Sequence, residues 1–182
     1  MPVLPWTIEE ERTLLETRVF TLRQRESASQ LRPGVRGRFV YLDTPDWINV
    51  IALTPDNEVI LIEQYRHGTN EITLEIPGGM VDDGEDLVVA GIRELREETG
   101  YVADHAELIG MVSPNPAIQD NSCGTLLLRD VRLDGEPELD PNEEIAVKRV
   151  PLAEIPELIR SRTISHALVV AAFHHLHLHQ GT

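Results

Sequence analysis

Residues 79–101 read GMVDDGEDLVVAGIRELREETGY, and this stretch decides the fold of the chain. Its second half predicts an amphipathic helix, because apolar residues recur at helical spacing and Gly100 is a suitable C-terminal cap. The missing side chain of Gly91 allows a neighbouring element to approach that helix closely. The stripe that we expect to pack inward consists of Leu87, Val88, Gly91, Ile92 and Leu95.

Three glutamates share another face of the same helix. Glu94, Glu97 and Glu98 stand at i, i+3 and i+4, which makes them neighbours on a helical surface, and like charges at this spacing repel. A solvated acidic face would account for the charges alone. A divalent cation with oxygen ligands gives a reason for keeping three carboxylates together, so the pattern indicates a metal site.

The stretch resembles the Nudix box, G-x5-E-x7-R-E-U-x-E-E-x-G-U, in which U is a bulky apolar residue. A long pattern with fixed gaps in a strand–loop–helix context has a low false-positive rate. The resemblance covers about residues 45–180 and implies an α+β fold, the Nudix-type α/β/α sandwich with a mixed sheet. Tyr101 stands where an aliphatic residue is commoner, and the matching positions are Gly79, Glu85, Arg93, Glu94, Glu97, Glu98 and Gly100.

The Nudix resemblance also implies a chemistry: attack of water on a P–O–P bridge, assisted by Mg²⁺ or Mn²⁺. Glu85 and Arg93 are expected mainly to hold the metal ligands in place. The implied ligands are the Gly78 carbonyl, Glu94, Glu97, Glu98 and Glu143. The residues assigned to catalysis are Glu97, Glu98 and Glu143, with Arg93 organising them.

Two features bias the expected substrate toward nucleoside diphosphate sugars. Arg66 follows a predicted strand in a Gln-x-Arg context, which in ADP-ribose pyrophosphatases of the family supplies an arginine that contacts the substrate diphosphate. Pro116 lies fifteen residues after the box, near a proline that marks that branch. The branch tends to show Ser-Pro-Gly, whereas this chain has Asn-Pro-Ala there, so sugars other than ribose stay open. Further candidates for substrate contact are Trp47, which either stacks on a nucleobase or packs, and Glu75, Gly79 and Met80.

We therefore expect hydrolysis of ADP-ribose and related nucleoside diphosphate sugars to a nucleoside monophosphate and a sugar phosphate. The alternatives are a Nudix pyrophosphohydrolase for a nucleoside triphosphate or dinucleoside polyphosphate, and a non-catalytic nucleotide sensor on the same fold. Related enzymes place a general base and a metal ligand in a Glu-x-Glu-x-Ile element. Alignment on Ile145 puts Glu143 at the ligand position and Pro141 at the base position, so the base is sought among Glu97, Asp140, Glu143 and Glu144.

The rest of the chain predicts a β-rich protein with two further helical segments. Residues 18–22 fit strand and helix alike. The resemblance to nucleotide-sugar Nudix hydrolases implies that residues 1–46 form a small β lobe that helps build a homodimer, and that residues 47–182 form the catalytic domain. Residues 47–54 and 58–65 are predicted to form a β-hairpin. Further strands are predicted at 36–41, 71–76, 106–112, 123–131 and 145–150, and helices at 151–159 and from a Ser165 cap to His179. The histidines at 174, 175, 177 and 179 are read as an exposed helix end rather than a metal site.

Composition limits the class of partner. The 182 residues carry a formal net charge of −15, which argues against binding to nucleic acid or an anionic membrane. Cys123 is the only cysteine, so no intrachain disulfide can form. With no basic-then-apolar leader near the N-terminus and no long apolar run, we expect a cytoplasmic protein.

Overall fold

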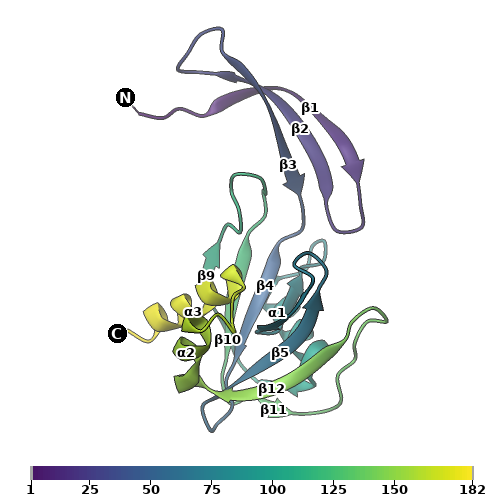
Figure 1. Cartoon of the computed structure of the whole chain (residues 1–182), viewed down its shortest axis with the longest axis vertical. Helices are drawn as coiled ribbons and strands as arrows, with labels where there is room; N and C mark the ends of the chain where they lie inside the picture. Colours follow the sequence, from purple (N-terminus) through teal and green to yellow (C-terminus); the bar gives the residue numbers. More distant parts are fainter. Residues whose placement is uncertain (1, 182) are drawn as a thin grey trace. The chain divides into compact units, whose positions relative to one another are not determined.

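The structure is a computed structural model that describes residues 2–181, and it divides into two compact units (Figure 1). The first unit contains the chain up to Pro45 together with Ser113–Asn121. The second contains Asp46–Val112 and the chain from Ser122 onward. Each unit is described by itself below.

The first unit is built on a three-stranded antiparallel sheet in the order β1-β2-β3. Its strands are β1 (Trp6–Glu16), β2 (Thr21–Ser29) and β3 (Arg36–Asp43). The ambiguous residues 18–22 form a turn and the beginning of β2, so the helical alternative is wrong there. Ser113–Asn121 joins this unit through a backbone hydrogen bond from Leu42 N to Ile118 O of 2.8 Å. All eleven residues of β1 are exposed.

The second unit contains two main sheets. The larger one has the order β7-β4-β10-β9 and is mixed, because β4 and β10 run parallel while the other neighbours are antiparallel. Its strands are β4 (Trp47–Ala52), β7 (Gly78–Met80), β9 (Ala106–Val112) and β10 (Cys123–Leu128). The other sheet, β12-β5-β6, is antiparallel and consists of β5 (Glu58–Arg66), β6 (Glu71–Glu75) and β12 (Ile145–Pro151). A small two-stranded ladder pairs β8 (Tyr101–Val102) with β11 (Arg132–Leu133).

Helices cover both faces of these sheets. Successive strand residues point to opposite faces, so Ile48 and Val50 of β4 join a core under α1 (Leu87–Thr99), whereas Ile51 joins a core with α3 (Ala167–His179). A 3₁₀ turn (Leu152–Glu154) and α2 (Ile155–Arg160) lead into α3, which lies along β9 and β10 (Figure 1). The expected α/β/α sandwich with a mixed sheet is confirmed.

Several local predictions need correction. Strands β4 and β5 do not form a hairpin ladder, because they diverge into different sheets and share only the bridge Leu53–Val59. Ser165 does not cap α3, since His166 occupies the N-cap position. Ile92 on α1 is 37 % exposed instead of buried. Cys123 begins a strand that ends at Leu128 rather than at residue 131. The helix predicted at 151–159 is shorter, because α2 begins only at Ile155, with Pro156 in its first turn, where proline is tolerated.

Among the described residues 2–181, no helix is long and apolar enough to cross a membrane.

Candidate active site

Helix α1 is fixed firmly at both ends and along its inner face. The Asp86 carboxylate caps the N-terminus by accepting the Val88 N–H at 2.8 Å, and Gly100 ends the helix in the left-handed region with φ 72°. A Cβ added to Gly91 would lie 2.3 Å from Leu126 Cδ1, so the helix backbone rests directly on the sheet. The close approach expected at Gly91 is confirmed.

Arg93 is held in a web of carboxylates. Its Nε and Nη2 donate to Glu85 at 3.0 and 2.9 Å, while Nη1 donates to Glu94 at 2.9 Å and to Glu97 at 3.0 Å. The Glu85 hydrogen bonds are the main cause that raises the pKa of Arg93 above its usual range. One arginine thus contacts carboxylates from both halves of the 79–101 stretch.

Glu98 is the buried carboxylate of the site. It is 4 % exposed and accepts the Gly78 N–H at 2.9 Å. Burial raises its pKa to about 8, and the nearby charges of Glu94 and Glu143 add to the rise. Burial likewise raises the pKa of Glu94. For both carboxylates burial therefore disfavours the ionised form, and for Glu94 it does so in spite of the Arg93 ion pair.

The same carboxylates suit a hard cation. Glu94 and Glu98 supply oxygen ligands, and a Cβ added to Gly79 would lie 2.4 Å from Glu94 Oε1, so only glycine leaves room beside that carboxylate. Between residues 2 and 181 no three His, Cys, Asp or Glu side chains are gathered as a metal cluster. Arg93 instead holds the Glu94 and Glu97 carboxylates by ion pairs.

A second buried carboxylate lies on the other sheet. Glu75 at the end of β6 is 2 % exposed and accepts Arg66 Nε at 2.9 Å and Nη2 at 2.8 Å. The Thr73 hydroxyl donates to it at 2.6 Å, and His166 Nδ1 lies 2.9 Å away. Burial by itself would raise the pKa of Glu75, but these hydrogen bonds outweigh burial and hold the pKa below its usual range.

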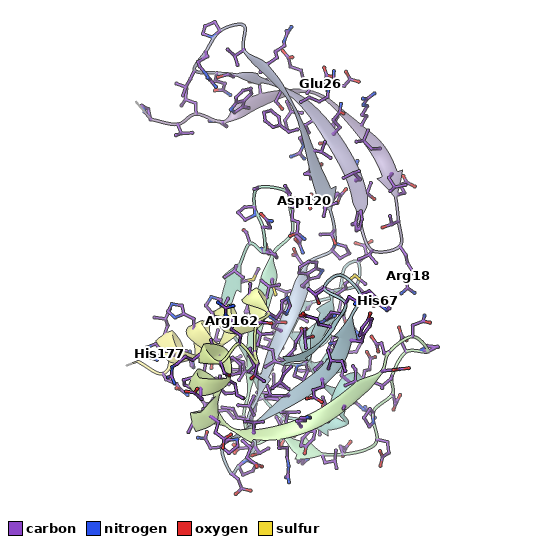
Figure 2. The ribbon with its side chains drawn as sticks, viewed as in Figure 1. Arg18, Glu26, His67, Asp120, Arg162 and His177 are labelled. Atoms are coloured by element: carbon purple, nitrogen blue, oxygen red, sulfur yellow. The ribbon has the colours of Figure 1, made fainter. Side chains whose placement is uncertain are left out.

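One cavity of about 540 Å³ in the second unit extends from Arg66 and Glu75 to the glycines at positions 78 and 79, and no residue of α1 lines it. Strand β4, the end of β5, β6, β7 and the beginning of α3 all line it, and His67 stands at its β5 side (Figure 2). The predicted substrate residues Trp47, Arg66, Glu75, Gly79 and Met80 lie in its wall together with Gly78. The cavity therefore joins an arginine presented by one sheet to the glycine-rich edge of the other.

The NUDIX domain model matches residues 44–173. The chain belongs to the NUDIX domain family. An ADP-ribose pyrophosphatase of Bacillus subtilis (strain 168) is 27% identical over 176 residues, which cover 94% of this chain and 95% of that protein. The ADP compounds hydrolase NudE of Escherichia coli (strain K12) is 27% identical over 168 residues, covering 91% and 88%. These findings confirm the prediction that this chain is a Nudix pyrophosphohydrolase.

Two further comparisons concern a relative with a different name and a solved structure. The methanol dehydrogenase activator of Bacillus methanolicus is 26% identical over 176 residues, covering 94% of this chain and 95% of that protein. A solved structure described as the crystal structure of ADP compounds hydrolase superposes with a TM-score of 0.86, covers 100% of this chain and 98% of that one, and is 24% identical. That likeness shows that the two proteins share the Nudix fold.

Several predicted site residues do not line the cavity of this Nudix domain. Among them are Arg93, Glu94, Glu97 and Glu98 of α1, of which Glu98 accepts the N–H of the cavity residue Gly78. Glu143 belongs to the exposed acidic loop before β12, where its carboxylate accepts the Asp140 N–H at 3.1 Å. Glu144 and Pro141 are exposed in the same loop. Pro116 belongs to the first unit. Of the C-terminal histidines, His175 is partly buried and bonds Thr125 at 3.0 Å, and the others are exposed on α3 (Figure 2).

Three residues of the cavity region were missed by the sequence analysis. Thr73 and His166 bond Glu75, and Asn49 lies in the cavity wall with its buried Nδ2 lacking a hydrogen-bond partner among the described residues. Asn49 stands between apolar neighbours on β4, and this break in the pattern was a usable signal. His166 carried no such signal, because it lies 91 residues from the carboxylate that it bonds.

Proposed function

We propose that this Nudix pyrophosphohydrolase cleaves the pyrophosphate bond of ADP-ribose and related nucleoside diphosphate sugars, releasing a nucleoside monophosphate and a sugar phosphate. Its relatives in Bacillus subtilis and Escherichia coli are named for ADP-ribose and ADP compounds, and each matches nearly the whole chain. The cavity volume of about 540 Å³ lies in the range of small-molecule sites.

The observation that carries the proposal is the presence of Arg66 in the same cavity as Gly78, Gly79 and Met80. The guanidinium has five N–H donors in a planar fork. Glu75 takes only the Nε and Nη2 side, so the edge formed by Nη1 and the second Nη2 hydrogen is left for phosphate oxygens. A diphosphate bound there extends from Arg66 toward the glutamates of α1.

We further propose Mg²⁺ or Mn²⁺ as the cofactor. Glu94 and Glu98 are the primary protein ligands, with the Gly78 carbonyl, Glu97 and Glu143 as further oxygen donors. Bound there, a divalent cation supplies charge neutralisation of the phosphates and acidification of water. The raised pKa values of Glu94 and Glu98 favour this assignment, because a bound cation offsets the cost of burying their negative charges.

The remaining roles fall to side chains of this chain. Arg93 holds Glu85, Glu94 and Glu97 in register, and Arg66 orients the diphosphate. Glu97 is 44 % exposed and is the most accessible carboxylate around Arg93. We assign it the role of general base, which accepts the proton of the attacking water. Asp140, Glu143 and Glu144 are the competing bases. Glu97→Gln should then lower kcat far more than Gln substitutions in that loop, and the opposite order places the base in the loop.

We also propose that residues 1–46 form a dimerisation lobe. The first unit has an edge strand, β1, that is exposed along its whole length. Apolar side chains are exposed on its sheet, among them Trp6, Ile8, Leu15, Phe39 and Val40. Such surface is unusual on a monomer and fits a second copy of the chain. Light scattering should give the mass of a dimer, and a monomer mass at micromolar concentration contradicts the proposal.

A product screen tests the function directly. Purified protein with MgCl₂ is offered ADP-ribose, GDP-mannose, dATP and diadenosine polyphosphates, and the products are resolved by chromatography. We expect AMP and ribose 5-phosphate from ADP-ribose, and no turnover after EDTA. Turnover of only dATP or the polyphosphates identifies a Nudix enzyme with another substrate. Binding of ADP-ribose without turnover of any compound identifies a sensor.

A further inference from the structure

The Glu75 carboxylate is shared between the ligand-binding arginine and the beginning of a distant helix. Oε1 accepts Arg66 Nε and the Thr73 hydroxyl, while Oε2 accepts Arg66 Nη2 and faces His166 Nδ1 at 2.9 Å. Arg66 keeps 43 % of its side chain exposed, whereas Glu75 keeps 3 %. The carboxylate is therefore the fixed part of the pair, and the groups that hold it also fix the arginine.

The hydrogen on His166 can be placed by elimination. Glu75 is ionised, because it accepts two hydrogen bonds from a guanidinium, and an ionised carboxylate cannot donate. His166 Nδ1 must then carry the proton and donate it to Oε2. The ring closes the side of the carboxylate that Arg66 and Thr73 leave open.

The position of His166 in the chain gives an independent sign of this role. It is the N-cap residue of α3, with extended φ and ψ of −68° and 120°, yet its side chain caps nothing. Ser, Thr, Asp and Asn are preferred at this position, and a poor cap costs a helix about 1 kcal/mol. His166 therefore departs from the usual preference for N-cap residues, as residues at functional sites do. Its side chain hydrogen-bonds Glu75 instead of capping the helix.

We propose that His166 is a positioning residue for substrate binding: by holding Glu75 from the N-terminus of α3, it fixes the Arg66 guanidinium in the orientation that receives the diphosphate. The inference rests on the proposed function of Arg66. It adds His166, which is distant in the sequence, to the pair formed by Arg66 and Glu75. Without the His166 bond, one lone-pair side of the buried carboxylate is unsatisfied, Glu75 turns toward water or α3, and Arg66 loses its fixed partner.

The expected kinetic effect is a rise in KM. Arg66 binds the diphosphate in both the ground state and the transition state, so its misplacement weakens binding more than it slows the chemical step. His166→Leu should raise KM for ADP-ribose about 10-fold, which corresponds to about 1.4 kcal/mol, and change kcat less than about 3-fold. A fall in kcat with an unchanged KM would instead make His166 an acid or base, and would overturn the positioning role.

Two matched variants separate positioning from helix capping. Asn and Ser are both good N-caps. Only the Asn amide can place a donor where Nδ1 stands while its oxygen caps α3; the Ser hydroxyl is too short to reach Glu75. His166→Asn should keep KM within about 3-fold of the wild type, and His166→Ser should raise it like His166→Leu. Equal KM values for the Asn and Ser variants overturn the proposal, even if His166→Leu fails to fold.

The Arg66 background supplies the decisive comparison. If His166 acts through Arg66, then His166→Ser added to Arg66→Ala should raise KM no further, so the two effects are strongly non-additive. Full additivity overturns the inference. His175→Leu is the control, because it removes a hydrogen-bonded histidine of the same helix that does not line the cavity, and it should leave KM unchanged. Inactivity of the wild type on diphosphate sugars would refute the proposed function separately.

Discussion

Two arginines of this protein sit among glutamates, and they are placed for different tasks. Arg93 faces three carboxylates, so its charge is more than neutralised and little of the guanidinium is left for a ligand. Arg66 faces one carboxylate and keeps a free edge in the cavity. The number of acidic partners thus distinguishes the arginine that we propose to organise the metal ligands from the one that we propose to bind phosphate.

The strongest test on the α1 side is Glu98→Gln, because Gln keeps the size of the side chain but not the charge. We expect kcat to fall about 10²–10³-fold, since a cation held by one fewer carboxylate contributes several kcal/mol less. Binding of ADP-ribose, measured by calorimetry, should change little. Unchanged turnover would refute the metal assignment.

Removing the organising arginine should cost less. Arg93→Met leaves Glu85, Glu94 and Glu97 without their shared cation, so they repel and the ligands lose their orientation. We expect kcat to fall roughly 10–100-fold, as for other residues that hold metal ligands, with KM little changed. Steady-state kinetics at saturating Mg²⁺ measures this. A rise in KM with unchanged kcat would contradict this role and show that Arg93, like Arg66, acts in substrate binding.

Removing the ligand-binding arginine should act in the other kinetic parameter. Arg66→Ala should raise KM for ADP-ribose roughly 10–100-fold, because a charge-assisted hydrogen bond contributes about 1.5–3 kcal/mol and each 1.4 kcal/mol is tenfold. Arg149→Ala is the control, since this exposed arginine pairs with Glu58 on the same sheet outside the cavity. Similar KM values in both variants would remove Arg66 from the site.

The smallest expected effect is on stability and depends on pH. The pKa of Glu75 is lowered in the fold, so its ionised form stabilises the protein; this contribution is complete above the ordinary glutamate value of 4.5 and is lost as pH falls below it. Glu75→Gln should therefore lower the free energy of unfolding by about 1–3 kcal/mol at pH 7. Denaturant titrations should show the difference shrinking toward pH 3. The exposed Glu71→Gln on the same strand should show no such trend.

The same contrast explains what the sequence could predict. Arg93 bonds residues one, four and eight positions away, so a local pattern contains the whole web. The sandwich also followed from that pattern, because the box implies a family fold. The bond between His166 and Glu75 spans 91 residues and depends on where α3 begins. No periodicity encodes such a contact.

The error over the hairpin has a similar cause. Pro55 and its neighbours do form the predicted turn, and both flanking strands exist. Local turn chemistry cannot say whether two strands stay paired, since that depends on which partners each finds elsewhere. Strand β4 pairs with β7 and β10, whereas β5 pairs with β6 and β12. Because β4 and β5 diverge, both sheets line one cavity. The pairing that was predicted wrongly is therefore one on which the site depends.

Gly91 has a consequence for which sequence changes the protein can accept. The backbone of α1 there lies against the side chains of Leu126, Ile48 and Val50, with no side chain of the helix between them. An Ala at position 91 must therefore displace the Leu126 side chain or lift the helix. The glutamates one and two turns further along the helix move with it. A methyl group that lifts the helix from its buried face would therefore also displace the glutamates that we propose as metal ligands.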